Sequence, residues 1–185
     1  FGKGGDVTIF VTGSATFTDG MIQTAAADFS SAGSAGAVSV TANDSLEMIN
    51  TTINARALFA NGNAGPVTLK TYGSLSLTDS FISTQSSAPG NGGTVTITGK
   101  DVTLNDSSIL TFIFGNDDPA LGLLHAGTVT ITAENTVTVS GSLFGDPGIP
   151  VISANATGAF VDAGPVTIAG NTVNLSNGTI DVGMQ

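Results

Sequence analysis

Short runs in which aliphatic residues alternate with threonine or serine recur along the whole chain. A Gly-x-Val-Thr-Ile-like element occurs in six copies about 30 residues apart, a spacing typical of repeat architectures. The first aliphatic residues of these copies are Val7, Val38, Val67, Val95, Val129 and Val166. A second alternating triplet follows each copy, and then a small polar residue. Alternation with a period of two predicts strands that bury one face.

A further isoleucine marks a third short strand in each repeat. It appears as Ile22, Ile53, Ile82, Ile109, Ile152 and Ile180, with the fifth delayed by an insertion. No repeat can bury its aliphatic face alone, so the repeats must stack. Three parallel-stacked strands per repeat predict an all-β fold, a right-handed parallel β-helix (solenoid) of about six coils. Residues 1–185 then form one domain, with coils near 5–35, 36–64, 65–92, 93–126, 127–163 and 164–185.

The same register predicts which side chains point inward and which point outward. The six anchor valines should form a core ladder inside the solenoid. The residues that follow them should form an outer ladder, Thr8, Ser39, Thr68, Thr96, Thr130 and Thr167. The next outward positions are Phe10, Thr41, Lys70, Thr98, Thr132 and Ala169. Two longer segments, 112–126 and 141–151, should protrude from one side.

The corners of each coil have their own sequence signals. A glycine precedes each first strand, which fits a positive φ or a close approach of two backbones. A small polar residue follows each second strand and fits a turn closed by its own side chain. These residues are Asp19, Asn50, Asp79, Asp106, Gly141 and Asn177.

Composition narrows the partners that the chain can bind. Fourteen acidic residues against four basic ones give a formal net charge of −10. Nucleic acids and anionic membrane surfaces need clustered lysine and arginine, so both are disfavoured as partners. The chain contains no cysteine and no apolar run long enough to span a membrane as a helix. We therefore expect neither disulfides, nor thiolate metal sites, nor membrane insertion.

Candidate chemistry is sparse. A Thr-x-Thr array could order water and bind ice, but threonine is also a neutral outward partner in stacked strands, and this scaffold reading is favoured. Asp117 and Asp118 could hold Ca²⁺ together with backbone carbonyls, although the segment lacks a ligand-loop signature. No other cofactor is expected. Acids around Asp117, Asp118 and Asp146 could serve a carbohydrate-active solenoid. His125 is the only histidine, so no catalytic triad follows from the sequence.

The repeat GNGGTVTITGKDVTLNDSSI and its variants AGPVTLKTYGSLSLTDSFIST and AGPVTIAGNTVNLSNGTID resemble the repeats of bacterial exoproteins of the filamentous-haemagglutinin type. Those proteins are exported by two-partner secretion. The resemblance covers essentially the whole chain and implies a secreted or cell-surface, rod-like protein used in adhesion, biofilm or matrix. It transfers no catalytic residues.

The chain opens inside a corner and stops just after Ile180-Asp181-Val182, with no capping helix at either end. We expect a segment of a longer array, or units that join end to end into a filament. The leading hypothesis is a non-enzymatic, extracellular structural or adhesive rod that contacts glycans, proteins, flanking repeats or further copies of itself. A carbohydrate-active or carbohydrate-binding solenoid and an ice-binding surface are the alternatives.

Overall fold

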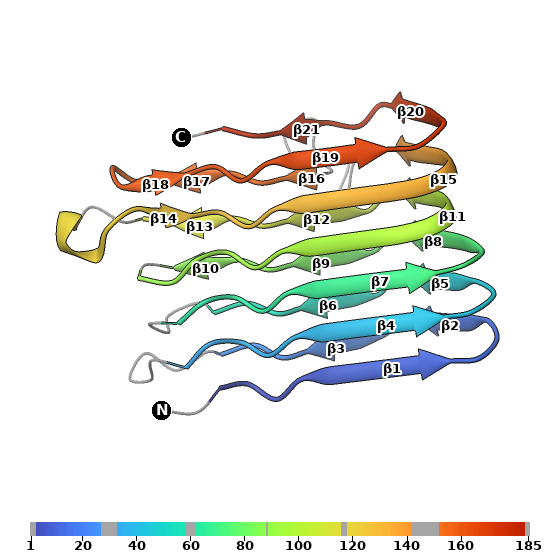
Figure 1. Cartoon of the computed structure of the whole chain (residues 1–185), viewed down its shortest axis with the longest axis horizontal. Helices are drawn as coiled ribbons and strands as arrows, with labels where there is room; N and C mark the ends of the chain where they lie inside the picture. The colour runs from blue at the N-terminus through green and yellow to red at the C-terminus, as the bar shows by residue number, and fades with distance from the viewer. Residues whose placement is uncertain are drawn as a thin grey trace.

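A computed structural model describes residues 3–26, 33–57, 62–87, 89–115, 118–141 and 152–183. The described residues form a parallel β-helix, as the repeat predicted: every strand pair is parallel, and each strand lies beside its equivalent in the next repeat. In Figure 1 the first strands run on the near side, the second strands return behind them, and the chain rises from the N-terminus to the C-terminus. This path is the expected right-handed winding.

The first and second strands of all coils belong to one ten-stranded sheet that bends around a corner. The first strands are β1 (Val7–Val11), β4 (Val38–Ala42), β7 (Val67–Thr71) and β19 (Val166–Ala169). The second strands are β2 (Ala15–Thr18), β5 (Leu46–Ile49), β8 (Ser74–Thr78) and β20 (Thr172–Ser176). In coils four and five one strand serves both positions, β11 (Val95–Asn105) and β15 (Val129–Ser140).

The third strands form a six-stranded sheet that closes each coil. They are β3 (Met21–Gln23), β6 (Thr52–Asn54), β9 (Phe81–Ser83), β12 (Ser108–Leu110), β16 (Ile152–Ser153) and β21 (Ile180–Asp181). Ile109 pairs with Ile152, and Ile152 pairs with Ile180. The insertion in the fifth repeat therefore leaves the isoleucine ladder in register.

Coils three to five also carry a lateral extension, which the sequence suggested only as a protruding loop. It contains the 3₁₀ turn η1 (Pro119–Leu121) and five two-residue strands. These strands are β10 (Ser86–Ser87), β13 (Ile113–Phe114), β14 (Leu124–His125), β17 (Ala156–Thr157) and β18 (Val161–Asp162). A small second core fills the extension, made of Ile113, Leu124, Ala126, Ala156 and Val161. The described residues of segment 112–126 thus belong to the wall of coil four and pair with short strands of coils three and five. Most of segment 141–151 lies outside the described residues.

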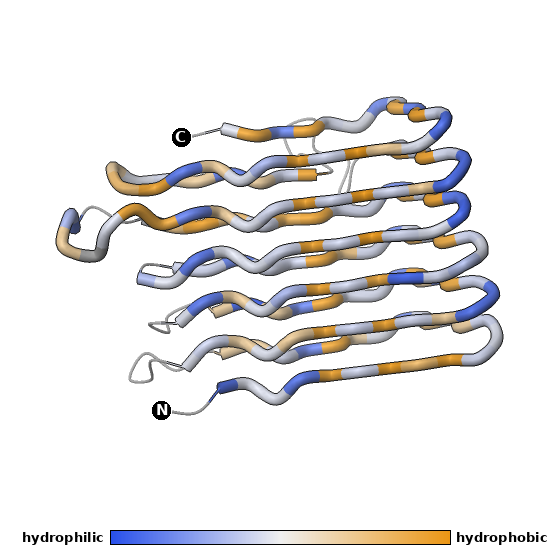
Figure 2. The backbone as a smooth tube through the Cα atoms, in the orientation of Figure 1, coloured by the Kyte–Doolittle hydropathy of each residue, from blue (hydrophilic) through white to orange (hydrophobic). Residues whose placement is uncertain are grey.

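The main core is one continuous column of aliphatic side chains. The register stacks the six anchor valines in order, from Val7 to Val166. The four inner valines are fully buried, and the two outermost are half-buried because each has a coil on one side only. Figure 2 shows apolar positions repeating above one another from coil to coil. Burying each such side chain contributes about 1.5–3 kcal/mol, so every coil depends on its neighbours.

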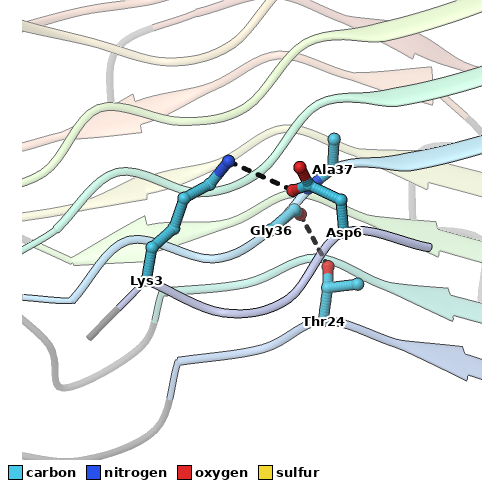
Figure 3. A network of polar contacts seen from close by, with 5 residues as sticks. All are labelled: Lys3, Asp6, Thr24, Gly36 and Ala37. Atoms are coloured by element: carbon cyan, nitrogen blue, oxygen red, sulfur yellow. Dashed lines mark hydrogen bonds and ion pairs between the residues drawn. The ribbon is translucent and has the colours of Figure 1, made fainter.

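Glycines stand where two walls of the solenoid meet. A Cβ added to Gly36, Gly65, Gly93, Gly127 or Gly164 would collide with the carbonyl of the equivalent glycine one coil below. None of these five has a positive φ, so close backbone approach is the reason for glycine there. The amide of Gly36 donates to the carbonyl oxygen of Thr24 across the coil (3.1 Å), while the Thr24 hydroxyl donates to the carbonyl of Gly36 (2.7 Å; Figure 3). This pair of bonds closes the coil.

The polar residues after the second strands share a left-handed backbone. Their φ values are +46° to +53° for Asp19, Asn50, Asp79, Asp106 and Asn177, and +76° for Gly141. Aspartate, asparagine and glycine are the residues that adopt this conformation at least cost. The backbone conformation, more than a side-chain-closed turn, therefore explains the repeated choice of residue.

Replacing Gly127 by alanine should test the close approach. The added Cβ meets backbone atoms of Gly93, which cannot move without breaking the stack. We expect the free energy of unfolding to fall by about 3 kcal/mol, measured by denaturant titration. Gly5→Ala is the matched control, because nothing lies within 4 Å of its Cβ position. Equal stability of the two variants would contradict the close-approach explanation.

Replacing Asp79 by alanine should test the left-handed turn. Alanine at this backbone conformation costs about 1–2 kcal/mol, so thermal or denaturant unfolding should show a loss of that size. Asp79→Asn should be nearly neutral, because asparagine already occupies the equivalent positions at Asn50 and Asn177. A destabilised asparagine variant would mean that the carboxylate, not the backbone, is what the turn requires.

Candidate binding surface

The outer ladder lies in register on the outside of the first strands. Thr8 lies beside Ser39, and the series continues through Thr68, Thr96 and Thr130 to Thr167. We call this surface face 1. Its second column is irregular, as Phe10 is 64 % exposed and the ammonium of Lys70 lies 4.9 Å from the ring centre of Tyr72. Face 1 therefore carries one complete hydroxyl column and one mixed column.

A larger hydroxyl array covers the outside of the second strands, and the sequence reading did not single it out. We call this surface face 2. Its first column is Ser14, Ser45, Ser74, Asp101, Thr136 and Thr172. Its second column is Thr16, Glu47, Ser76, Thr103, Thr138 and Asn174. Its third column is Thr18, Ile49, Thr78, Asn105, Ser140 and Ser176. The sequence signal for face 2 is the serine or threonine that stands before, between and after the two aliphatic positions of most second triplets.

Side-chain hydrogen bonds link neighbouring coils within face 2. The Ser45 hydroxyl donates to the Ser14 hydroxyl (2.8 Å), and the Ser140 hydroxyl donates to the side-chain oxygen of Asn105 (3.0 Å). At the adjoining left-handed turns the side-chain amide of Asn50 donates to the carboxylate of Asp19 (2.7 Å). These bonds fix the orientation of polar groups on the surface.

A buried hydroxyl ladder supports the same edge from inside. The Ser80 hydroxyl accepts the amide of Thr51 (3.1 Å), and the Ser107 hydroxyl accepts the amide of Ser80 (3.0 Å). The hydroxyls of Thr51, Ser80 and Ser107 each also donate to the backbone carbonyl two residues earlier in the chain. All three side chains are buried, so the ladder satisfies backbone groups that would otherwise lie unpaired. Face 2 is consequently held on a rigid support.

Of the three predicted loop acids, Asp118 is the one that lies among the described residues. The carboxylate of Asp118 accepts the amide of Ala120 (2.9 Å) and caps η1, while Asp117 and Asp146 lie outside the described residues. His125 Nδ1 lies 3.6 Å from a carboxylate oxygen of Asp162, and both side chains are about half exposed. Among the described residues no group of three or more His, Cys, Asp or Glu side chains is arranged to hold a metal ion.

The first coil is joined to the second by a carboxylate clamp. The carboxylate of Asp6 accepts the amide of Ala37 (2.8 Å) and the ammonium of Lys3 (3.1 Å; Figure 3). The hydrogen bond from Ala37, followed by the bond and charge of Lys3, lowers the pKa of Asp6 below its usual value of 3.8. The interaction therefore stabilises the fold when the carboxylate is ionised.

Comparison with known proteins identified no relative: no family model, curated protein or solved structure matches the chain. Within the described residues, no helix has the length and apolar character to cross a membrane.

Acidification should release the clamp of the first coil. Because the pKa of Asp6 is lowered in the folded state, its contribution is fully present above about pH 3.8 and disappears as the pH falls through the folded-state value. Hydrogen exchange of the Ala37 amide, followed by NMR from pH 5 downward, should show earlier loss of protection than the amide of Val95. In Asp6→Asn this difference in pH dependence should vanish. An unchanged profile in that variant would assign the effect to another group.

Proposed function

We propose that this chain is a non-enzymatic, structural and adhesive β-helix rod of a secreted or cell-surface bacterial protein, similar to the filamentous-haemagglutinin type. One observation carries the proposal. The register over a continuous core places serine or threonine at most of the outward positions on successive coils of face 1 and face 2. Such a surface presents equivalent hydrogen-bonding groups about 4.8 Å apart along the rod.

A repeating surface suits a repeating ligand. A single exposed hydroxyl contributes about 0.5–1.5 kcal/mol to a hydrogen bond, which is too little for useful affinity alone. When the ligand is a polymer, each further contact becomes intramolecular and avidity rises without any new kind of contact. Serine and threonine can both donate and accept, as sugar hydroxyls can. Glycans of cell surfaces or of a biofilm matrix therefore fit these faces.

The two alternatives have weaker support in the structure. For a carbohydrate-active site, the carboxylate of Asp118 caps η1, and Asp117 and Asp146 lie outside the described residues. For ice binding, a regular array is required, and Phe10, Lys70, Glu47 and Ile49 interrupt the hydroxyl columns. Mixed polar surfaces favour recognition of sugars.

The last coil supports a second element of the proposal, stacking against a flanking repeat or another copy. Its ladder residues Val173, Leu175 and Ile180 are 48 %, 51 % and 40 % exposed. Their partners in the coil below, Val137, Val139 and Ile152, are buried. A further coil placed on β19, β20 and β21 would bury these side chains by the same register that joins the coils of this chain.

Adhesion of protein-coated beads to bacterial surface and matrix polysaccharides tests this function. Beads carrying the native chain should be retained under flow well above blank beads, and Thr103→Val with Thr138→Val should reduce retention several-fold, because hydroxyls are lost from face 2 at constant shape. Thr52→Val with Thr157→Val is the matched control outside both faces. Retention equal to that of blank beads on all glycans tested would refute an adhesive role.

A further inference from the structure

We propose that face 2 binds a cationic amino-sugar polysaccharide, a polymer that carries free amines as well as hydroxyls, lying along the axis of the rod. The inference rests on the proposed adhesive function and names the class of its partner. It is carried by the combination of two features on one surface: a central field of hydroxyls and carboxylates along both edges.

Carboxylates border face 2 where its strands begin and end. On the edge at the left-handed turns lie Asp19, Asp79 and Asp106. On the edge at the preceding turns lie Asp44, Asp101 and Glu134, and Glu47 stands within the face. Lys100 is the one basic residue that the described chain places among these seven acids. Face 2 is therefore strongly negative at its edges.

The other basic residues lie elsewhere. Lys3 is bound to Asp6, and Lys70 lies on face 1 beside Tyr72. Nε of Arg56 donates to the side-chain oxygen of Asn54 on the third strand β6 (2.6 Å). The two columns of face 1 contain Lys70 and no acidic residue. The turns that hold Asp44, Asp101 and Glu134 join first strands to second strands and so border both faces, whereas Asp19, Asp79 and Asp106 lie at the far edge of face 2 and Glu47 lies within it. A cationic partner is therefore more complementary to face 2 than to face 1.

The dimensions allow both edges to act on one polymer. The five residues from Ser14 to Thr18, which cross face 2, span about 13 Å between the first and last Cα atoms. A polysaccharide that lies along the middle of face 2 is then within one Debye length of the carboxylates at each edge, since this length is about 10 Å at 0.1 M ionic strength. The six stacked strands extend for about 24 Å along the axis, which gives the polymer several equivalent contacts.

The chemistry of the two partners is complementary. Protonated amines donate charge-assisted hydrogen bonds to carboxylates, and these are about twice as strong as neutral ones. The carboxylates of Asp19 and Asp106 each accept a side-chain amide hydrogen bond and keep further lone pairs for a ligand. Sugar hydroxyls pair with the serine and threonine columns. A polycation without hydroxyls would bind only to the carboxylates at the edges of face 2. A neutral glycan would bind only to its serine and threonine columns.

Calorimetric titration with a fully deacetylated glucosamine oligomer, compared with its N-acetylated counterpart, tests the charge requirement. At slightly acidic pH and low salt we expect the deacetylated oligomer to bind at least tenfold more tightly, and a linear polyamine of equal charge to bind less tightly than it does. Equal affinity for the two oligomers, or a tighter polyamine, would overturn the proposal.

Paired variants locate the site. Asp79→Asn with Asp106→Asn keeps residues that the left-handed turn accepts and should weaken binding about tenfold. Asp118→Asn with Asp162→Asn removes the same charge from the lateral extension and should change affinity less than twofold. Likewise, Ser76→Lys with Thr103→Lys on face 2 should abolish binding, while Thr68→Lys with Thr96→Lys places equal charge on face 1 in the same coils and should largely preserve it.

The outcomes separate this inference from the proposed function. Equal losses in each matched pair would show attraction by net charge alone and would refute face 2 as the site. Bead adhesion to neutral glycans would then persist, leaving the adhesive rod intact. Circular dichroism of every variant at the titration temperature checks that the fold is retained.

Discussion

In-register parallel stacking is the constraint on which the whole structure depends. Backbone amides in the strands of the inner coils bond to the neighbouring coil, as when Val38 donates to Pro66 and Val67 donates to Thr94. Because these bonds form only when equivalent residues superpose, a change of length is tolerated only where the chain leaves the common path. The fifth repeat shows this, since its insertion precedes Ile152 and the isoleucine still stacks on Ile109.

The same constraint explains why the fold could be predicted from the sequence. Period-2 alternation fixed the inward valines, and the repeat spacing fixed which valine lies above which. The glycines were recognised as corners, but only the structure distinguishes their reason, as Gly65 has an ordinary φ and no room for a Cβ. The lateral extension was less predictable because Ile113-Phe114 and Leu124-His125 are strands of two residues. Strands of two residues form only by pairing with the next coil, and they are too short to show an alternating pattern in the sequence.

The candidate surface was only partly predictable for a related reason. The outer ladder of face 1 follows from the Val-Thr-Ile motif itself. Face 2 is made of residues that flank the less regular second triplets, where Glu47, Asp101 and Asn174 hide the hydroxyl pattern. The buried ladder of Thr51, Ser80 and Ser107 follows directly after the turn residues, and its burial depends on how the corner folds. Their polarity alone predicts that these side chains are exposed, whereas the structure buries all three.

Stacking also decides where charge can lie, and this connects composition with function. Two carboxylates in one column would stand about 4.8 Å apart and repel by roughly 1 kcal/mol in water and several times more at lower dielectric. The three columns of face 2 hold only Glu47 and Asp101, which stand in different columns. Three of the other acids lie at the left-handed turns, where aspartate is one of the few residues that adopt the required backbone. A low charged fraction in the strands and a negative rim around a neutral field are therefore two results of one geometry. The amino-sugar polysaccharide that we propose for face 2 would be selected by its charge at this rim and held by its hydroxyls in the field.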